Sequence, residues 1–259
     1  MDALIGHSGF VGGNLAALRR FAACFNSKNI ESIRGKKFDT LVVSGMPAAK
    51  WLANRDSLGD QAVLDRLWSN IACCKADTVV IVSTVDVYPA PLGVDEDTMI
   101  EPLYQQPYGR HRLELERRAT AHFPRVLTLR LPGLYGPGLK KNAIYDLLHD
   151  NETHKIHSAG AYQFYNLNRL WKDIGIALAA NLRVVNLATE PVTMRDVARR
   201  AFDMDFATEP GGLPPRYDMR TKHAAIFGGR NGYIETKSEV LAGIAAFVAA
   251  ERTLMRVAA

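Results

Sequence analysis

A glycine-rich turn near the start of the chain constrains the fold more than any other feature. Gly6, Gly9 and Gly12 are spaced G-x-x-G-x-x-G between a short apolar run, residues 3–5, and an amphipathic stretch, residues 10–21. A strand that turns through glycines into a helix directs free backbone N–H groups and the positive helix end at one point, which suits a pyrophosphate. The alternative is an ordinary strand-to-helix turn that contains glycines. The position and context favour a dinucleotide-binding turn.

Composition narrows the class of protein. The chain has 259 residues, 47% of them hydrophobic, which is enough for one large α/β domain or a main domain with a small appendage. The net charge of +5 is spread without a basic run, so nucleic acid is not expected and anionic small molecules are favoured. Three cysteines without metal-ligand spacing, Cys24, Cys73 and Cys74, indicate neither a metal site nor a disulfide framework. We therefore expect a cytoplasmic protein with no signal peptide and no membrane partner.

Strand and helix patterns alternate along the first half of the chain, which indicates a mostly parallel sheet covered on both faces. The predicted strands are residues 21–25, 39–44, 78–83, 125–131 and 182–187, and the predicted helices are 60–76, 108–122 and 193–202. We predict a Rossmann-type doubly wound parallel sheet in residues 1–133, with strand and helix returns near 163–187. The remainder, residues 134–259, is expected to form mainly a small substrate-binding lobe and a C-terminal helix.

Two further motifs contain residues suited to ligand binding and proton transfer. A hydroxyl pair, Ser83 and Thr84, ends a predicted buried strand, and ligands of open α/β sheets sit at the carboxyl ends of strands. Tyr108 and Arg112 begin a predicted helix and, four residues apart, share one face of it. A fixed cation beside a tyrosine can lower the phenol pKa and make it a usable proton donor or acceptor. His111 is expected to point away from this pair, toward the surface.

Four motifs in order resemble the short-chain dehydrogenase/reductase superfamily, in its extended and atypical branches of the NAD-dependent epimerase/dehydratase type. They are Gly6-x-x-Gly9-Phe10-Val11-Gly12, Ser83-Thr84-x-x-Val87-Tyr88, Tyr108 at the tyrosine of Y-x-x-x-K, and residues 130–138, which are similar to R-x-x-N-x-Y-G-P-G. The resemblance covers nearly the whole chain. It implies that Thr84, Tyr108 and Arg112 are the catalytic residues, with arginine where the family has lysine.

The resemblance also implies the reaction. Hydride would pass between a nicotinamide and a carbonyl or secondary alcohol carbon, Tyr108 would give or take the proton, and Thr84 would hydrogen-bond the same oxygen. The family lysine holds the nicotinamide ribose and lowers the tyrosine pKa. Arg112 keeps the charge as a bulkier planar fork, so either hydride chemistry is retained with a shifted geometry or only binding remains.

The choice of cofactor depends on the end of the second predicted strand. Members of the family that bind NAD usually place a carboxylate there for the adenosine ribose. This chain has Asn26, Ser27 and Lys28, and a lysine can pair with a 2′-phosphate, which favours NADP over NAD. Residues 26–37 are also short for the usual strand and helix. The full set of predicted cofactor-binding residues is Gly6, Gly9, Phe10, Val11, Gly12, Asn26, Ser27, Lys28, Gly45, Met46, Ser83, Tyr108, Arg112, Leu131 and Gly133.

Substrate contacts are expected from Lys50, Thr84 and Asp86. Val85 and Asp86 occupy the positions of the Asp-Glu pair of sugar-nucleotide dehydratases, and the loss of one carboxylate argues against dehydration. We predict an NAD(P)-dependent oxidoreductase acting on a small molecule, with sugars and sugar nucleotides as candidates. A sugar-nucleotide epimerase with tightly bound NAD and a non-catalytic NAD(P)-binding regulatory protein stay open as alternatives. The resemblance implies a homodimer formed through the helices at residues 60–76 and 108–122.

Overall fold

The computed structural model describes residues 1–258, and at Pro102 and Ala258 it describes the backbone alone. The chain divides into two compact units. The first, called the sheet unit below, comprises residues 1–90, 96–131 and 170–186. The second unit comprises residues 91–95, 132–169 and the chain from residue 187 onward.

Parallel strands form the centre of the sheet unit. Within the described residues the sheet has six strands in the order β10-β6-β4-β3-β1-β2, and every neighbouring pair is parallel. The strands are β1 (Ala3–Ile5), β2 (Ala23–Phe25), β3 (Lys37–Val43), β4 (Lys75–Thr84), β6 (Val126–Leu131) and β10 (Val184–Asn186). This topology confirms the predicted Rossmann-type doubly wound fold.

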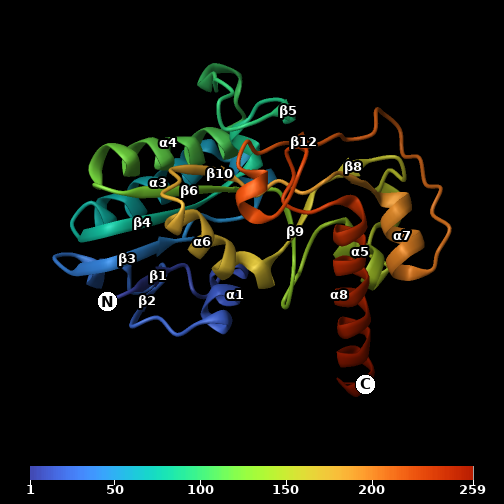
Figure 1. Cartoon of the computed structure of the whole chain (residues 1–259), viewed down its shortest axis with the longest axis horizontal. Coiled ribbons are helices and arrows are strands. Elements are labelled where there is room, and N and C mark those ends of the chain that lie inside the picture. The colour runs from blue at the N-terminus through green and yellow to red at the C-terminus, as the bar shows by residue number, and fades with distance from the viewer. Residues whose placement is uncertain (259) are drawn as a thin grey trace. The chain divides into compact units, whose positions relative to one another are not determined.

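Helices cover both faces of this sheet. Helices α3 (Ser57–Ile71) and α4 (Pro107–His122) pack together on one face, and α1 (Phe10–Leu18) and α6 (Leu170–Ala179) lie on the other (Figure 1). A short helix, α2 (Lys50–Arg55), contacts α3 and α4. Helical turns η1 (Ile30–Ile33), η2 (Val85–Val87) and η3 (Pro102–Tyr104) complete the unit. Burial on both faces explains why β6 is apolar or fully buried at every position.

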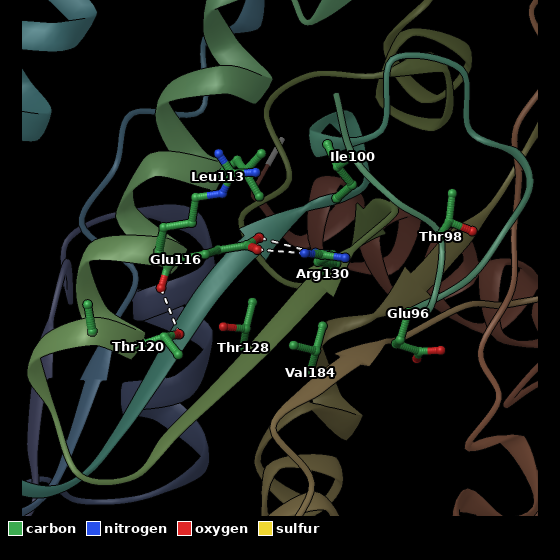
Figure 2. Close-up of a pocket in the computed structure, with 11 residues that line it drawn as sticks. Glu96, Thr98, Ile100, Leu113, Glu116, Thr120, Thr128, Arg130 and Val184 are labelled. Carbon is green, nitrogen blue, oxygen red and sulfur yellow. Dashed lines mark hydrogen bonds and ion pairs between the residues drawn. The ribbon is translucent and has the colours of Figure 1, made fainter. Parts of the chain in front are cut away.

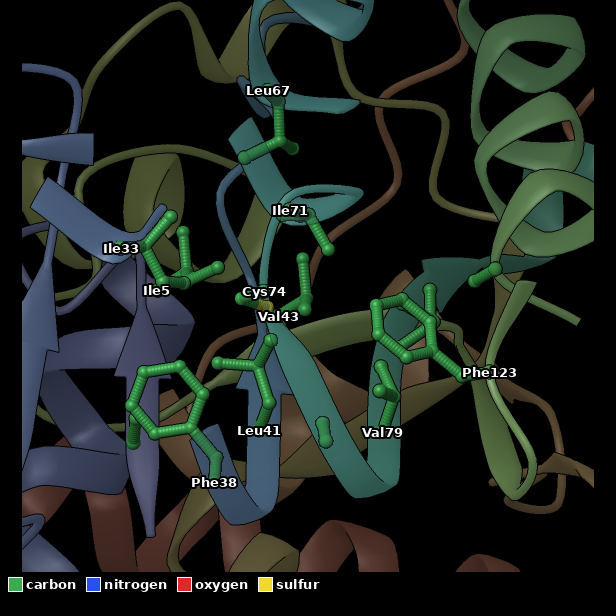
Figure 3. Close-up of a cluster of buried hydrophobic side chains, with 14 of the residues drawn as sticks. Ile5, Ile33, Phe38, Leu41, Val43, Leu67, Ile71, Cys74, Val79 and Phe123 are labelled. Atoms are coloured by element: carbon green, nitrogen blue, oxygen red, sulfur yellow. The ribbon is translucent and has the colours of Figure 1, made fainter. Parts of the chain in front are cut away.

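The hydrophobic core of the sheet unit lies between the sheet and α3 and α4. Figure 3 shows Leu67 and Ile71 of α3 pointing at Leu41, Val43 and other strand residues. Each of these side chains is buried. Burying a leucine or isoleucine side chain stabilises a fold by about 1.5–3 kcal/mol, so this cluster holds the strand ends in fixed positions.

The structure corrects one predicted helix boundary. The predicted helix at residues 60–76 ends at Ile71, and β4 begins at Lys75 instead of residue 78. Alternating burial starts at Lys75, and the backbone N–H of Lys75 donates to the carbonyl of Lys36 at 2.8 Å. Sheet pairing to β3 therefore determines the conformation of a stretch whose local pattern suggested a helix.

The second unit is built from short pairs of strands and three helices among its described residues. The strand pairs are β5 (Leu92–Val94) with β12 (Asp218–Met219), β7 (Gly133–Tyr135) with β9 (Phe164–Asn166), and β8 (Ala161–Tyr162) with β11 (Val192–Thr193). The helices are α5 (Ala143–His149), α7 (Met194–Phe202) and α8 (Lys237–Ala258), with helical turns η4 (Thr153–Lys155), η5 (Leu167–Arg169) and η6 (Ala224–Phe227). Its core joins side chains of α5, α7 and α8. None of the helices in residues 1–258 combines the length and apolar character needed to cross a bilayer.

Candidate active site at the carboxyl edge of the sheet

The glycine turn connects β1 to α1 with almost no free space. Gly6 has φ +88°, and a Cβ atom there would lie 2.4 Å from the carbonyl oxygen of Ser44. A Cβ at Gly12 would lie 2.1 Å from the carbonyl oxygen of Gly6. Gly9 is the N-cap of α1, and no side chain caps that helix end. The backbone geometry therefore fits a pyrophosphate, which would take the place of a capping side chain.

The segment that would bind the adenosine half of a dinucleotide is short. Asn26, Ser27 and Lys28 follow β2 directly, and the side-chain oxygen of Asn26 accepts the backbone N–H of Lys28 at 2.9 Å. The turn meets the glycine loop, because Gly6 N–H donates to the carbonyl of Phe25 at 2.8 Å. From there the chain returns to β3 through η1 alone, so β2 is the last strand of the described sheet on this side.

The loop after β3 lies beside the glycine turn. The Ser44 hydroxyl donates to the carbonyl of Ile5 at 2.8 Å, and Gly45 is close enough that a Cβ would lie 3.0 Å from Ile5 Cγ2. Met46 packs against the core of the sheet unit. The carbonyl of Pro47 accepts a hydrogen bond from Arg112. This loop therefore links the glycine turn to α4.

Thr84 and Tyr108 are brought together by one close backbone contact. A Cβ at Gly109 would lie 1.8 Å from the carbonyl oxygen of Asp86, so only glycine lets α4 begin directly against η2. The Thr84 side chain lies near enough to the Tyr108 phenol to lower its pKa. Thr84 also pairs in register with Leu131 of β6. Two predicted catalytic residues, 24 positions apart in the sequence, thus meet at the carboxyl edge of the sheet.

Arg112 is buried and fully engaged with protein atoms. Its two terminal nitrogens donate to both carboxylate oxygens of Asp60 and to the carbonyls of Pro47 and Tyr108; the Nη2–Oδ1 and Nη1–O(Tyr108) distances are both 3.1 Å. The guanidinium carbon lies 3.9 Å from the centroid of the Tyr108 ring. All four hydrogens on the terminal nitrogens have protein acceptors, so a ribose hydroxyl that binds a terminal nitrogen would have to replace one of these bonds.

Sequence reasoning missed Asp60 and was wrong about His111. His111 is 2% exposed, and its Nδ1 lies 2.7 Å from Asp60 Oδ2 on the neighbouring helix. The Asp60 carboxylate therefore bridges two consecutive residues of α4, one of them Arg112. Helical periodicity places His111 off the Tyr108 face, but that side of the helix meets α3 rather than solvent. A contact between residues 51 positions apart leaves no signal in local sequence.

Lys50 and Asp86, both predicted to contact substrate, form an ion pair next to Tyr108. Lys50 Nζ lies 2.6 Å from Asp86 Oδ1, and the Thr84 hydroxyl lies 3.5 Å from Asp86 Oδ2. The side chains of Lys50 and Asp86 are 44% and 19% exposed. The site therefore runs from a partly buried phenol to a half-exposed lysine.

The environment of Tyr108 favours its neutral form. Burial raises the pKa of Tyr108 above its ordinary value of 10, and the Asp86 charge raises it further, while Arg112, Lys50 and the Thr84 hydrogen bond act in the opposite direction. Tyr108 is consequently a proton donor at neutral pH in the chain without ligands.

Ser83 points away from this cluster. Successive strand residues face opposite sides of a sheet, and the Ser83 hydroxyl donates to Glu116 on the inner face of α4. Glu116 pairs with Arg130 at 2.7 Å, and these two side chains line a cavity of about 450 Å³ together with Thr128, Val184 and residues of the 96–100 segment (Figure 2). Glu116 follows Arg112 by four residues, so this cavity borders the stripe of α4 that carries Tyr108 and Arg112.

The sheet unit gathers all the predicted site residues except Gly133. This unit contains the glycine turn, residues 26–28, 45–46 and 83–84, Lys50, Asp86, Tyr108, Arg112 and Leu131. Gly133 belongs to β7 of the second unit, where a Cβ would lie 2.8 Å from the carbonyl oxygen of Gln163. Among residues 1–258, no group of three or more His, Cys, Asp or Glu side chains is arranged to hold a metal ion.

Comparisons with known proteins address the fold. Neither a protein-family model nor a curated protein sequence matches the chain. Solved structures do. The UDP-glucose 4-epimerase of Thermotoga maritima with UDP-glucose superposes with a TM-score of 0.70 at 16% identity, covering 98% of this chain and 100% of that one. The chain therefore has the fold of these solved structures.

Two further structures illustrate the range of chemistry on this scaffold. The dTDP-4-dehydrorhamnose reductase of Clostridium acetobutylicum has a TM-score of 0.72 at 14% identity, covering 97% of this chain and 100% of that one. An NAD-dependent NDP-hexosamine 5,6-dehydratase of tunicamycin biosynthesis has a TM-score of 0.70 at 18% identity, covering 97% of both chains. Epimerase, reductase and dehydratase share one fold, so the fold alone does not select the reaction.

Proposed function

We propose that this chain is an NAD(P)-dependent oxidoreductase of the short-chain dehydrogenase/reductase type. Its substrate is a carbonyl compound or secondary alcohol, with sugars and sugar nucleotides as the first candidates. The observation that carries the proposal is the close approach of α4 to η2 at Gly109, which places Tyr108 beside Thr84 in the same unit as a glycine turn shaped for pyrophosphate. Solved enzymes with this fold act on nucleotide-linked sugars, which supports the choice of candidates.

Each residue of the site has a separate role in the proposed reaction. The backbone of the glycine turn and the N-terminus of α1 bind the pyrophosphate, and Gly45 and Met46 border the nicotinamide. When bound, the nicotinamide supplies or accepts the hydride. Tyr108 gives its phenolic proton to the carbonyl oxygen, and Thr84 donates a hydrogen bond to the same oxygen. Such proton transfer typically contributes 10²–10⁴-fold to the rate.

Arg112 acts on Tyr108 through its charge and its position over the ring. Its guanidinium counters the effect of burial on the phenol pKa, and the Asp60 carboxylate fixes it in that place. Lys50 and Asp86 lie at the open end of the cluster, where Lys50 can bind a carboxylate or phosphate of the substrate. Arg112 is an unusual residue for this position, and it is the main argument for a binding protein without catalysis.

An epimerase with tightly bound NAD is the second candidate. The UDP-glucose 4-epimerase has the same fold and nearly the same extent as this chain. Oxidation and re-reduction of one carbon need the same hydroxyl pair, Thr84 and Tyr108. Net consumption of a reduced nicotinamide separates the two candidates, because an epimerase consumes none.

The test is a turnover assay with purified protein. The chain is incubated with NADPH or NADH and a panel of UDP- and dTDP-linked keto sugars, and separately with NAD or NADP and UDP-glucose or UDP-glucuronic acid. We expect oxidation or reduction of the nicotinamide that disappears in Tyr108→Phe. Interconversion of sugars without net nicotinamide change would select the epimerase. Calorimetric binding of NAD(P) without turnover of any substrate would select the regulatory protein.

Three further features belong to the same proposal. Lys28, with no carboxylate at residues 26–29, favours NADP, and titration calorimetry with both nucleotides tests this choice. We propose a homodimer that pairs α3 and α4 of two copies, and light scattering measures its mass. A cytoplasmic location fits the three cysteines, none of which forms a disulfide in the structure.

A further inference from the structure

We infer that Thr84 and Asp86, with Asp86 oriented by Lys50, form a proton path that connects Tyr108 to solvent. The inference deepens the proposed function and rests on it: a net reduction draws one proton from water at each turnover, and this path delivers it. An epimerase needs no such path, because Tyr108 returns in the second half-reaction the proton that it took from the substrate hydroxyl in the first.

The need for a path arises from the state of Arg112. A guanidinium does not release its protons in the accessible pH range, so Arg112 cannot relay one. The terminal nitrogens are also saturated by Asp60, Pro47 and Tyr108, and the side chain is 3% exposed. The cation four residues after Tyr108 therefore tunes the phenol but carries no proton away from it.

Besides Arg112, two charged groups act on the pKa of Tyr108: Asp86 and Lys50. Asp86 and then Lys50 lie between Thr84 and the solvent. The phenol lies beside Thr84, whose hydroxyl donates to Asp86 Oδ2 at 3.5 Å, the long end of the hydrogen-bond range. Asp86 Oδ1 contacts Lys50 Nζ at 2.6 Å, and exposure of the side chain rises from 19% at Asp86 to 44% at Lys50.

The two oxygens of Asp86 have different partners, and this gives the path its direction. Lys50 occupies Oδ1, which leaves Oδ2, the oxygen that faces Thr84, to carry a proton. Lys50 is thus a positioning residue that orients the carboxylate. The Asp86 backbone N–H also donates to Thr84 Oγ1 at 3.2 Å, which holds the hydroxyl of Thr84 within reach of both neighbours.

The proton steps balance as follows. In a reduction, the phenolic O–H bond of Tyr108 breaks, and its proton goes to the substrate oxygen while hydride from the reduced nicotinamide reaches the carbon. Thr84 then gives its hydroxyl proton to the phenolate. Asp86, protonated on Oδ2 by water, gives that proton to Thr84 and returns to a carboxylate. One proton leaves the solvent, and all three residues regain their starting forms.

The first test compares early and later turnovers in a rapid-mixing experiment with NADPH and the best carbonyl substrate of the panel. Tyr108 holds one proton at the start, so Asp86→Asn should keep its first turnover and slow later turnovers by about tenfold or more. Measured at saturating substrate, so that a lost substrate contact of Lys50 does not count, Lys50→Met should show the same pattern more weakly, by about threefold. Asp86→Glu and Lys50→Arg should restore the later turnovers, since they keep the acid and the charge.

A matched ion pair supplies the control. Glu152 and Lys155 form a surface pair in the second unit, and Glu152→Gln and Lys155→Met should leave both phases unchanged. Equal slowing of first and later turnovers in Asp86→Asn would overturn the path, because a structural defect would slow both alike.

A second readout needs no substrate. The phenolate absorbance of Tyr108, obtained as the difference between each protein and its Tyr108→Phe counterpart, reports the phenol pKa. Asp86→Asn should lower that pKa and Lys50→Met should raise it, following the signs of the two charges. An unchanged titration in both variants overturns the path. Shifted titrations without any nicotinamide turnover would instead contradict the proposed function and support the connection of Tyr108 to Asp86 and Lys50.

Discussion

Two buried arginines of the sheet unit lie over tyrosine rings, and the comparison between them separates a reactive group from a structural one. Arg112 pairs with Asp60 and lies 3.9 Å from the Tyr108 ring centroid. Arg130 pairs with Glu116, and its guanidinium carbon lies 5.1 Å from the ring centroid of Tyr88. Burial raises the pKa of both phenols, and both arginines act against that rise.

The difference lies in what each phenol bonds to next. The Tyr88 hydroxyl accepts a hydrogen bond from Arg130 at 2.8 Å and another from the Asn186 amide at 3.0 Å. Asn186 is fully buried and does not titrate, and Arg130 keeps its protons, so neither of these two partners can pass a proton to Tyr88. The Tyr108 network ends at the half-exposed pair of Asp86 and Lys50. The same residue types therefore make a structural tie where the phenol bonds to side chains that hold their protons, and they suit the proposed acid–base role where the neighbours are an ion pair open to solvent.

Removing each phenolic oxygen tests the difference between Tyr108 and Tyr88 most directly. Tyr108→Phe should lower turnover by about 10²–10⁴-fold with little change in stability, because the proton donor is lost. Tyr88→Phe should retain turnover but lose about 1–3 kcal/mol of unfolding free energy, since Arg130 and Asn186 lose a buried partner. Turnover assays and urea denaturation measure the two effects. Equal activity of the two variants would show that Tyr108 is no more reactive than Tyr88.

Neutralising the second arginine should give the largest loss of stability. Arg130→Met leaves the Glu116 carboxylate buried without its cation, which typically costs about 3–5 kcal/mol. The double variant Arg130→Met with Glu116→Leu should recover most of that loss. Chemical denaturation monitored by circular dichroism measures both. A cost well below 1 kcal/mol would mean that solvent reaches Glu116 through the adjoining cavity.

Adding one methyl group at Gly109 should separate Tyr108 from Thr84. A Cβ there collides with the carbonyl of Asp86, so Gly109→Ala should shift α4, cost about 1–3 kcal/mol and reduce turnover. Gly175 in α6 is the matched control, because nothing lies within 4 Å of its added Cβ. Gly175→Ala should stabilise the protein by roughly 0.5–1 kcal/mol, the usual gain in a helix. Thermal melts and turnover assays compare the pair.

The pH dependence of stability should be alike for the two tyrosines. The folded-state pKa of each lies above the unfolded value of 10, so below pH 10 this contribution is fully present. It is lost as the pH rises above 10, where the unfolded chain ionises first. Tyr108→Phe and Tyr88→Phe should each flatten the loss of stability above pH 10, measured by denaturation at a series of pH values. A steeper decline in either variant would contradict the assigned burial.

The smallest expected effect concerns the cofactor. Lys28→Ala should weaken NADP binding severalfold and leave NAD binding unchanged, because an exposed lysine contributes about 1 kcal/mol or less to a phosphate contact. Titration calorimetry with both nucleotides tests this. Tighter binding of NAD than of NADP by the unaltered chain would remove the reason for preferring NADP.

Much of the fold was predictable because its signals are local. Apolar runs identified the buried strands, and the spacing of Gly6 and Gly12 identified the turn whose backbone contacts allow only glycine. Thr193 and Asp196 form a capping box that starts α7 close to the predicted boundary. The prediction of a helix through residue 76 is wrong because pairing of Lys75 and Ala76 with β3, a distant strand, determines the conformation there.

The site was only partly predictable, because its decisive contacts are long-range. Motif positions identified Thr84, Tyr108 and Arg112, but nothing near Arg112 in the sequence indicates that Asp60, 52 residues earlier, binds it. The ion pair of Lys50 and Asp86 spans 36 residues and follows from the packing of η2 and α2 beside α4. Such contacts depend on how strands order themselves in the sheet, which periodicity does not specify.

The short edge of the sheet at β2 bears on how long a nucleotide stays bound. This strand has three residues, and the chain returns from it through a single helical turn, so the adenosine half of a dinucleotide meets few side chains. Fewer contacts shorten the residence time, since differences in affinity arise mostly in the dissociation rate. A reductase must exchange its spent nicotinamide after every cycle, whereas an epimerase keeps one molecule through many. Rapid exchange at β2 would therefore suit an enzyme that uses its nucleotide as a second substrate.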